Sequence, residues 1–433
     1  MMRFSTLFLL LVLIAAVPCA ANEGEAQDKR PILERLVAQA LVENPDLRAA
    51  EQRWRMFERK VIPAGTLDDP MLTLSMNNFP VDTLAGNEAP MTSRDIVLAQ
   101  KFPFPGKLGS KAEQAEQQAL WYKGVYEDSR LQLVRQVKDA YYSLYYLDKA
   151  IEITEKNLKL LDDFIRLTEI RYQVGQGLQQ DVLKAQVERS KLMDRLFALR
   201  QQRLTAQANL NTLLARPAAS PVEKLPEFEL VEAKVSVPEL IEQAEEARPL
   251  FAAYQSLIDR FRSQKKFAEL DYRPDFNVFA AYKFREENRG DDGVDFVSAG
   301  VTFNLPVWQE RRGEVVAEAD SGIRMAYQQY NDLRNKVGFN ISDAHAQLEK
   351  NRQQVLLFKT GIIPQATQAL QAALSAYQVG KVEFLSLLDA QLTLQRYEMD
   401  YYRALTDYQR SLARLEAEAG RSLTDSQAKE TSP

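Results

Sequence analysis

The sequence predicts a mainly α-helical chain with a membrane β-barrel part, built from two internal repeats. Each repeat contains a β-hairpin and a long coiled-coil helical hairpin. The first observation is a duplicated motif: Tyr172-Gln173-Val174-Gly175 recurs 205 residues later (172 to 377) as Tyr377-Gln378-Val379-Gly380. The second is a pair of strand-like stretches in each half, and the third is a pair of long apolar-periodic segments after them. A repeat this long indicates one supersecondary unit used twice.

The N-terminal segment, residues 1–21, has the features of a secretory signal peptide. Arg3 is followed by an apolar run over 4–17 and by the small residues Cys19, Ala20 and Ala21. These are the charged, apolar and cleavage regions of an export signal. No later stretch reaches the ~18 apolar residues that a spanning helix needs. We therefore predict an exported chain that is periplasmic, secreted, or in a membrane as a β-barrel. Lipidation of Cys19 and the cleavage site stay open.

Charge and composition exclude several classes of function. Among 433 residues, 55 Lys and Arg stand against 60 Asp and Glu, and the net charge of −5 disfavours nucleic acid as a partner. One histidine and one cysteine are too few for a zinc site, which takes several nitrogen or sulfur ligands. A catalytic triad would depend on His345, which lies in a helical pattern and is interpreted as a packed or surface residue. We predict no enzyme activity, no metal site and no cofactor.

The first repeat is predicted over 22–216. It begins with a short helix from Pro31 to Met56, interrupted at Asn44-Pro45 because proline restricts the residue before it. Two alternating stretches are expected to be strands at about 70–79 and 93–103. No proline occurs from Gly106 to Arg216, so long helices are expected at about 107–173 and 178–214, joined by a turn at the first motif.

A proline-containing linker is predicted over 217–238, and the second repeat over 239–420. Its strands are expected at about 275–285 and 294–304, and its long helices at about 308–376 and 383–420. Pro364 occupies the position where the first repeat has Lys159, so a kink is expected in the second repeat alone. The final residues, 421–433, are polar and are predicted to be a disordered tail.

The four predicted strands are each about ten residues long, which is enough to cross a bilayer when tilted. In the third strand every second residue is apolar: Phe276, Val278, Ala280, Tyr282 and Phe284. An ordinary soluble hairpin has the same pattern, because barrel strands are weakly marked in sequence. Four strands cannot close a barrel in lipid, where open sheet edges are not tolerated. A membrane position therefore requires several copies that share one barrel.

The long helices carry heptad seams. Apolar residues recur in steps of three and four from Val137 to Tyr172, and again in the later long segments. A single helix over 107–173 would be about 100 Å long, too long to be buried in one compact domain. It must lie along other helices in an extended bundle. A barrel continued by a hollow bundle has the form of a duct.

Over nearly its whole mature length, the chain resembles outer-membrane efflux proteins of the TolC kind. The resemblance rests on the duplicated Tyr-x-Val-Gly turns, on Asp181-Val182-Leu183-Lys184-Ala185 and on Ser386-Leu387-Leu388-Asp389-Ala390. The run from Gln100 to Lys107 is similar to the heavy-metal cation branch. The family implies a homotrimer with twelve strands in the outer membrane of a Gram-negative bacterium and a periplasmic helical tunnel. It also implies that the tips dock with a periplasmic adaptor, a membrane fusion protein, of an inner-membrane RND-type pump.

The resemblance also implies which residues form the pore and the adaptor contact. In the family the pore closes at the tips, through rings of acidic residues and polar links between neighbouring helices. The matching positions imply that Asp389 belongs to such a ring. They imply that Asp181 and Tyr377 link helices in the closed state. Ser386 stands where other members can carry a second acid, and Val382 where an arginine can make a closing link. Thr393 lies on the same helical face as Ser386 and Asp389. The expected adaptor contacts are Tyr172, Val174, Gly175, Val379 and Gly380.

Alternatives remain for the site and for the function. The stripe with Asp389 could be a solvated outer face, Tyr172 and Tyr377 could be seam residues, and the tips could be simple turns. The second function class is a secreted or periplasmic coiled-coil scaffold without channel activity, which would extract without detergent. For a channel, the exported substrate stays open between heavy-metal cations and drugs, as do the pump and the adaptor.

Overall fold

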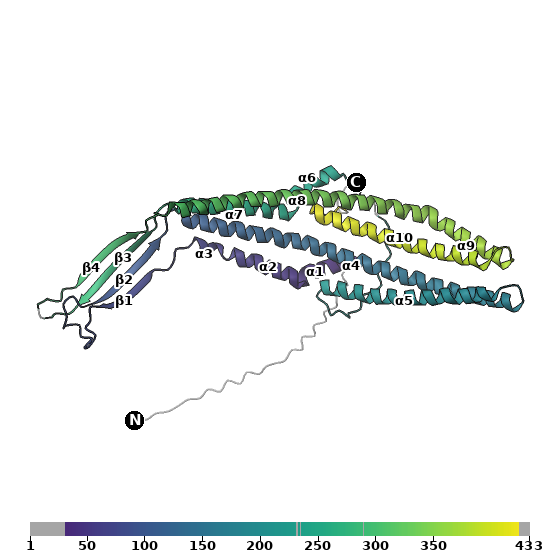
Figure 1. Ribbon diagram of the computed structural model, residues 1–433, viewed down its shortest axis with the longest axis horizontal. Helices are drawn as coiled ribbons and strands as arrows, with labels where there is room; N and C mark the ends of the chain where they lie inside the picture. Colours follow the sequence, from purple (N-terminus) through teal and green to yellow (C-terminus); the bar gives the residue numbers. More distant parts are fainter. Residues whose placement is uncertain (1–30, 231–232, 234, 289, 424–433) are drawn as a thin grey trace, which may run out of the picture.

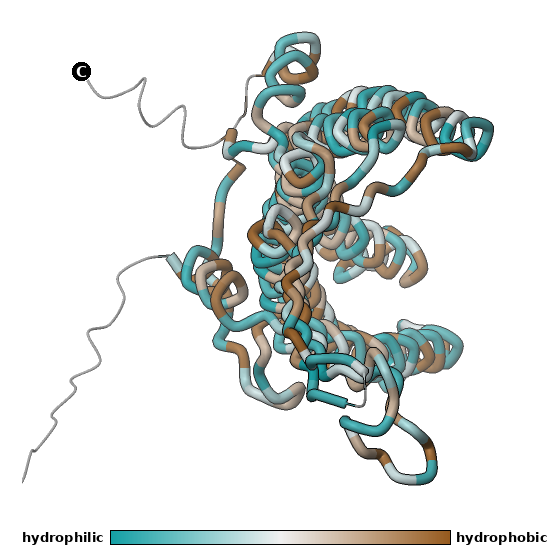
Figure 2. Tube along the Cα trace, turned by 90° about the vertical axis from the view of Figure 1, so that its left-hand side faces the viewer, coloured by the Kyte–Doolittle hydropathy of each residue, from teal (hydrophilic) through white to brown (hydrophobic). Residues whose placement is uncertain are grey.

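The computed structural model describes residues 31–230, 233, 235–288 and 290–423. The predicted signal peptide, 1–21, and residues 424–433 of the predicted tail lie outside the described residues. The molecule is elongated, with a β-sheet at one end and two helical tips at the other (Figure 1). Along its long axis the helices form an open arc instead of a closed ring (Figure 2). A single chain is thus one curved segment of a wall.

Four antiparallel strands form one sheet in the order β1-β2-β3-β4. They are β1 (Met71–Asn77), β2 (Ser93–Phe102), β3 (Phe276–Arg285) and β4 (Phe296–Phe303), so the first and the last are shorter than expected. The two repeats meet where β2 pairs with β3, from Ser93 opposite Arg285 to Phe102 opposite Phe276. Among the described residues, the outer edges of β1 and β4 have no strand beside them.

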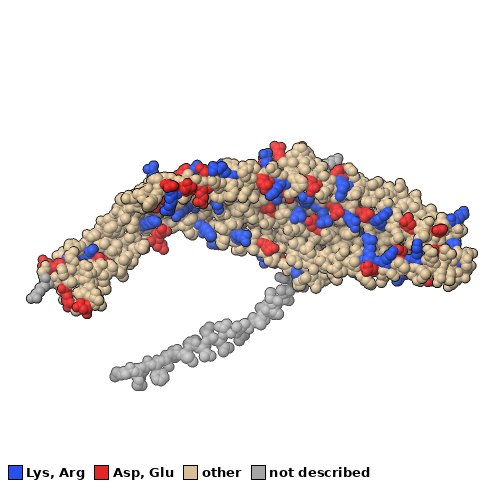
Figure 3. All heavy atoms as spheres, viewed as in Figure 1, with Lys and Arg blue, Asp and Glu red and all other residues tan. Residues whose placement is uncertain are grey.

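The register gives the sheet one apolar face and one mixed, mostly polar face. Residues opposite each other in an antiparallel pair project to the same side, so rows of like character form across all four strands. The apolar face, which contains Arg94 and Gln100 as its polar exceptions, carries Leu72, Leu74, Met76, Ile96, Leu98, Phe102, Phe276, Val278, Ala280, Tyr282, Phe284, Val297, Ala299, Val301 and Phe303. Charged side chains are sparse over the strands and frequent over the helices in Figure 3.

The first repeat contains α1 (Ile32–Glu43), α2 (Pro45–Glu58), α3 (Val61–Gly65), α4 (Lys107–Gln173) and α5 (Gln179–Leu213). The second contains α6 (Val237–Ala247), α7 (Pro249–Leu270), α8 (Gln309–Leu357), a π-helical turn η1 (Phe358–Ile362), α9 (Ile363–Gln378) and α10 (Phe384–Ala419). Asn44 separates α1 from α2, and its side chain accepts a hydrogen bond from the Leu47 amide. In the described part of the chain, no helix combines the length and the apolarity that membrane crossing requires.

The helix expected over 308–376, with a kink at Pro364, is interrupted by the π turn η1 directly before that proline. Before η1 the repeats are related by a shift of 204 residues, which pairs Val137 with Ile341 and Leu144 with Leu348. After η1 the shift is 205 and pairs Tyr172 with Tyr377. The second repeat therefore holds one additional residue here, and the wider π turn accommodates it. The turn lies just before Pro364, which has no N–H group to donate an α-helical hydrogen bond.

Clusters of buried apolar residues follow the length of the bundle. At the tips, buried residues of α4, α5, α9 and α10 form one cluster, among them Leu161, Leu192, Leu370 and Leu387. A second cluster packs α1 against α4. A third packs α6 against α8 and α10. Leu423 belongs to the last of these, and its amide donates to Glu416 Oε1 at 2.9 Å. The prediction of a disordered tail from residue 421 is therefore wrong for its first three residues.

A close approach between α4 and α7 gives a first testable prediction. A Cβ atom at Gly124 would lie 2.7 Å from Ala253 Cβ and 2.8 Å from the Pro249 carbonyl oxygen. Gly124→Ala is expected to destabilise the protein by about 1–3 kcal/mol, because the backbone must move. Gly109→Ala, in the same helix with nothing within 4 Å, is the control and should be neutral or stabilising. Thermal unfolding followed by circular dichroism measures both, and equal shifts would contradict the prediction.

Candidate functional site

The two helical tips have the same backbone structure. Gly175 and Gly380 have positive φ angles of 70° and 75°, which glycine adopts without a steric penalty. The amide of Gln176 bonds the carbonyl of Arg171 at 2.8 Å, and the amide of Lys381 bonds that of Ala376 at 2.9 Å. These bonds over five residues close α4 and α9 as Schellman motifs. The duplicated motif is thus a pair of helix C-caps, each leading into a short turn.

The residues predicted to contact an adaptor lie at the surface of these tips. Val174 and Gly175 are exposed in the α4–α5 turn, and Val379 and Gly380 are exposed in the α9–α10 turn. Tyr172, at the end of α4, is also exposed. Two valines that project into solvent offer a small apolar surface at the far end of the molecule. This placement leaves all five residues accessible to a docking partner.

Tyr172 and Tyr377 are equivalent in sequence but differ in environment. Tyr172 is 48% exposed, whereas Tyr377 is 3% exposed. The Tyr377 ring lies 5.7 Å from the ring of Phe384, and the Arg171 guanidinium lies 4.7 Å from its centroid. Arg171 Nη1 also donates to the Tyr377 carbonyl oxygen. One tyrosine therefore packs between hairpins while the other stays at the surface.

Asp181 and Tyr377, predicted to link helices, come near each other. Asp181 lies half-buried in the first turn of α5. Burial raises the pKa of the Tyr377 hydroxyl, and the negative charge of Asp181 raises it further. In the described structure the buried Tyr377 hydroxyl has no hydrogen-bond partner. The carboxylate of Asp181 thus acts on Tyr377 through its negative charge, and the structure describes no hydrogen bond between the two side chains.

The predicted pore residues lie on α10. Ser386 and Asp389 are exposed and Thr393 is half-buried, whereas Leu387, Leu388 and Gln391 on the other side of the helix are buried. Within the described residues, no ion pair involves Asp389. The stripe is therefore a solvent-facing surface of the single chain, as either a lumen lining or an outer face requires.

Arg171 is a tip residue that sequence reasoning missed. Its side chain leaves α4, reaches the end of α9 and bonds both the Tyr377 carbonyl and, at 3.3 Å, the Gln176 carbonyl. A comparison of the repeats would have marked it, because the equivalent residue is Ala376. No group of three or more histidine, cysteine or acidic residues able to hold a metal ion occurs among the residues that the structure describes.

Comparison with known proteins decides the family. The model of the outer membrane efflux protein family matches residues 36–216 and 240–421. The chain belongs to this family. The prediction of family and fold class is confirmed, and so is the outer-membrane location with a periplasmic helical extension. The efflux protein is an outer-membrane efflux channel and not an enzyme.

Curated relatives of the efflux protein match most of its length. It is 24% identical over 391 residues to the cobalt-zinc-cadmium resistance protein CzcC of Cupriavidus metallidurans, covering 85% of each chain. It is also 24% identical over 358 residues to the outer membrane efflux protein BepC of Brucella suis, covering 82% of this chain and 78% of the relative. These matches span both repeats.

Solved structures share the fold. The outer membrane protein VceC of Vibrio cholerae has a TM-score of 0.76 at 19% identity, covering 90% of this chain and 96% of its own. The open state of the MtrE outer membrane channel of Neisseria gonorrhoeae has a TM-score of 0.75 at 18% identity, covering 91% and 90%. CusC also has a TM-score of 0.75, at 17% identity and coverage of 90% and 92%.

Proposed function

We propose that this efflux protein is the passive exit duct of a tripartite efflux system and works as a homotrimer. The observation that carries the proposal is the sheet, which has one apolar face and, among the described residues, no strand beside either of its outer edges. Three copies joined from β4 to the neighbour's β1 would close a twelve-stranded barrel without edges, with the apolar rows toward outer-membrane lipid. The arc of long helices would continue the same wall as a periplasmic tunnel.

The proposed partners are a periplasmic adaptor and an inner-membrane RND-type pump, which would supply the energy. The exposed residues Val174, Gly175, Val379 and Gly380, together with Tyr172, are the proposed adaptor contacts. A duct open to solvent contains no energy source of its own, so directional export needs such a pump. The similarity to CzcC favours heavy-metal cations as cargo, with drugs as the second class.

Assembly and conduction test the proposal together. Fractionation is expected to place the mature chain in the outer membrane, and native mass spectrometry in detergent should give a trimer. Single-channel recording on the purified protein should show ion conduction. A soluble periplasmic monomer without pores would instead support a coiled-coil scaffold. The exposed apolar rows of the sheet favour the channel, because such a large apolar face is costly in water.

We place the pore-lining stripe at Asp389, flanked by Ser386 and Thr393. A trimer would bring three Asp389 carboxylates near one axis, where like charges in a narrow space attract cations. Asp389→Ala should weaken cation preference and block by multivalent cations added from the periplasmic side, with the trimer unchanged. The effect should be modest, because Ser386 adds no second acid. Asp163→Ala, at an exposed site on α4, is the control of equal charge change. Equal selectivity in parent and variant would remove Asp389 from the lumen.

A further inference from the structure

The internal repeat predicts how a second copy meets this one, an inference that rests on the proposed trimer. Within a chain, α4 of the first repeat packs along α10 of the second; we name this contact the in-chain seam. The counterpart of α4 is the helix formed by α8, η1 and α9, and the counterpart of α10 is α5. In a closed ring, α8 and α9 therefore lie along α5 of the next chain, and this contact is the between-chain seam.

Exposed apolar residues occur where this arrangement requires them. Leu183, Val187 and Phe197 are exposed on α5. Their counterparts on α10, 205 residues later, are Leu388, Leu392 and Tyr402, which are buried or half-buried at the in-chain seam. On the opposite edge, Leu357 is 55% exposed, whereas its counterpart Ile153, 204 residues earlier, is 7% exposed. Both free faces thus have the apolar character of a packed seam.

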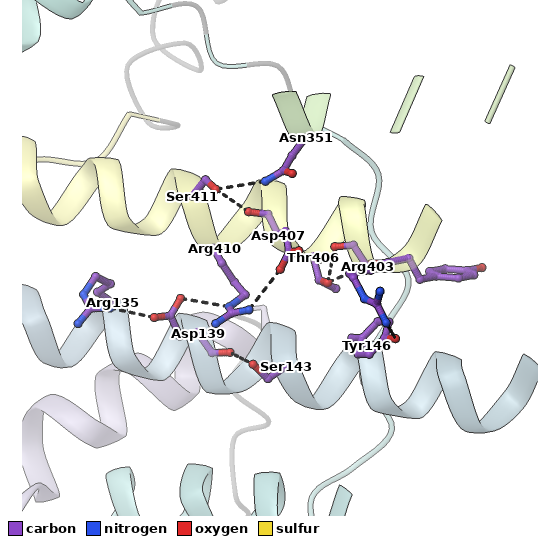
Figure 4. A network of polar contacts seen from close by, with 11 residues as sticks. Arg135, Asp139, Ser143, Tyr146, Asn351, Arg403, Thr406, Asp407, Arg410 and Ser411 are labelled. Carbon is purple, nitrogen blue, oxygen red and sulfur yellow. Dashed lines mark hydrogen bonds and ion pairs between the residues drawn. The ribbon is translucent and has the colours of Figure 1, made fainter. Parts of the chain in front are cut away.

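The two seams differ in their polar contacts. Across the in-chain seam, Lys156 pairs with Glu398 at 3.0 Å, Lys138 with Glu416 at 2.5 Å and Arg410 with Asp139 at 3.7 Å. Arg403 donates to the Tyr146 hydroxyl at 2.9 Å, and Figure 4 shows this bond and the Arg410 pair joining α10 to α4. The α5 counterparts of the four α10 residues are all uncharged: Met193, Asn211, Thr205 and Ala198. None of these ion pairs can therefore recur between chains.

The same difference exists at the tip. Arg171 crosses from α4 to the end of α9, bonds the Tyr377 carbonyl and lies over the Tyr377 ring. The between-chain counterparts are Ala376 for Arg171 and Tyr172 for Tyr377. An alanine side chain has no donor and cannot reach a neighbouring carbonyl. The tip ring thus holds one arginine contact at every in-chain seam and none at the equivalent positions between chains.

We infer that Arg171 fastens the two hairpin tips of one chain into a single body, and that the periplasmic tip opens by separation at the between-chain seams. Arg171 is a positioning residue, since it holds the hairpins and does not touch the transported solute. Three two-hairpin bodies then move apart at the seams that lack these ion pairs and the Arg171 contact. The ion pairs along α4 and α10 keep each body intact.

The first test supplies the missing contact. Ala376→Arg should bring a guanidinium to the Tyr172 backbone of the neighbouring chain and hold the tip closed. The open probability in planar bilayers is expected to fall on the order of tenfold, because a charge-assisted hydrogen bond forms at each of three seams. Ala376→Gln is the control of similar length without charge. An open probability of Ala376→Arg equal to that of Ala376→Gln would overturn the inference.

The second test fixes the between-chain seam covalently. The rings of Phe164 and Phe384 lie 6.4 Å apart across the in-chain seam, and their between-chain counterparts are Ala369 and Gln179, which are both exposed. Gln179→Cys with Ala369→Cys, treated with a short bis-maleimide, should give covalent dimers and trimers and keep the channel at its lowest conductance. Cys19, the only native cysteine, lies in the predicted signal peptide.

The outcomes separate this inference from the proposed function. Absence of a trimer or of conduction in the parent would remove the proposed function. A conducting trimer that does not cross-link would overturn the seam register alone, and a cross-linked channel that opens like the parent would overturn the opening at that seam. Arg171→Ala in the cross-linked channel should restore opening through the in-chain seam, while Arg171→Lys should restore less of it. A cross-linked Arg171→Ala channel that stays closed would remove the role of Arg171.

Discussion

Arg248→Ala is expected to lower the free energy of unfolding by about 3–5 kcal/mol, because it leaves one buried and one largely buried carboxylate without their cation. Arg248 precedes α7, and its side chain is 8% exposed. Its Nε lies 2.8 Å from Asp128 Oδ1 of α4, and its Nη1 donates to Glu418 Oε2 of α10. One guanidinium thereby joins three helices that belong to both repeats.

The charge state of Arg248 supports this expectation. Burial lowers the pKa of its guanidinium, but hydrogen bonds and charges from Asp128 and Glu418 raise it, and the net shift is upward. The side chain is therefore a permanent cation that balances two anions. Space at the site is also limited, since a Cβ atom at Gly420 would lie 2.9 Å from the Ala247 carbonyl oxygen. Little water can enter to replace the lost charge.

Thermal unfolding followed by circular dichroism in detergent measures the effect. The control is Arg166→Ala, because the Arg166 and Asp163 side chains are 66% and 60% exposed and such pairs contribute about 0–1 kcal/mol. Arg248→Ala should melt well below the parent, and Arg166→Ala close to it. Equal melting temperatures would show that Asp128 and Glu418 are solvated in the assembled protein.

Local patterns explain why the fold class could be predicted. Alternation in Phe276–Arg285 and steps of three and four from Val137 to Tyr172 depend on neighbouring residues only. The duplicated motif then showed that the elements occur twice. The π turn was not predicted, although the change from a shift of 204 to one of 205 was present in the sequence. A proline predicts a break, and only the geometry shows that an additional residue is accommodated there.

The tip site was harder to predict, because its contacts join distant parts of the chain. Arg171 and the Tyr377 carbonyl are separated by 206 positions, and neither sequence neighbourhood marks the bond. Tyr172 and Tyr377 have identical motifs, yet one is exposed and the other buried. This difference follows from which hairpin edge is free in a single chain. Comparing the repeats position by position shows where such asymmetry arises, as at Arg171 and Ala376.

Deletion of Gly361 combined with Pro364→Lys is expected to leave the fold intact. If η1 holds one additional residue, its removal should let α8 and α9 join as one regular helix, as in α4. The side chains before and after the deletion then keep their orientation toward the neighbouring helices, because a π turn adds one residue without rotating the helix that follows it. Pro364 must change as well, since proline inside a regular helix costs about 3 kcal/mol. Lysine is the residue at the equivalent position of the first repeat, Lys159.

The matched control is deletion of Lys159 from α4, which has no π turn. Each residue advances an α-helix by about 100°, so this deletion rotates the following side chains away from their partners. Leu161 and Phe164, both buried, would leave the tip cluster. Loss of a buried leucine or phenylalanine contact costs about 2–5 kcal/mol each, more than a helical tip can tolerate.

The amount of heat-modifiable oligomer in the outer-membrane fraction distinguishes the two deletions. The Gly361 deletion with Pro364→Lys should accumulate like the parent, and the Lys159 deletion should give little folded protein. If neither deletion variant accumulates as folded oligomer, η1 is not the place where the second repeat accommodates its additional residue. The shift between the repeats would then change from 204 to 205 elsewhere in the helix. The pairing of Leu357 with Ile153 would then rest on a wrong register. The seam between chains would have to be assigned anew, because its partners follow from that alignment.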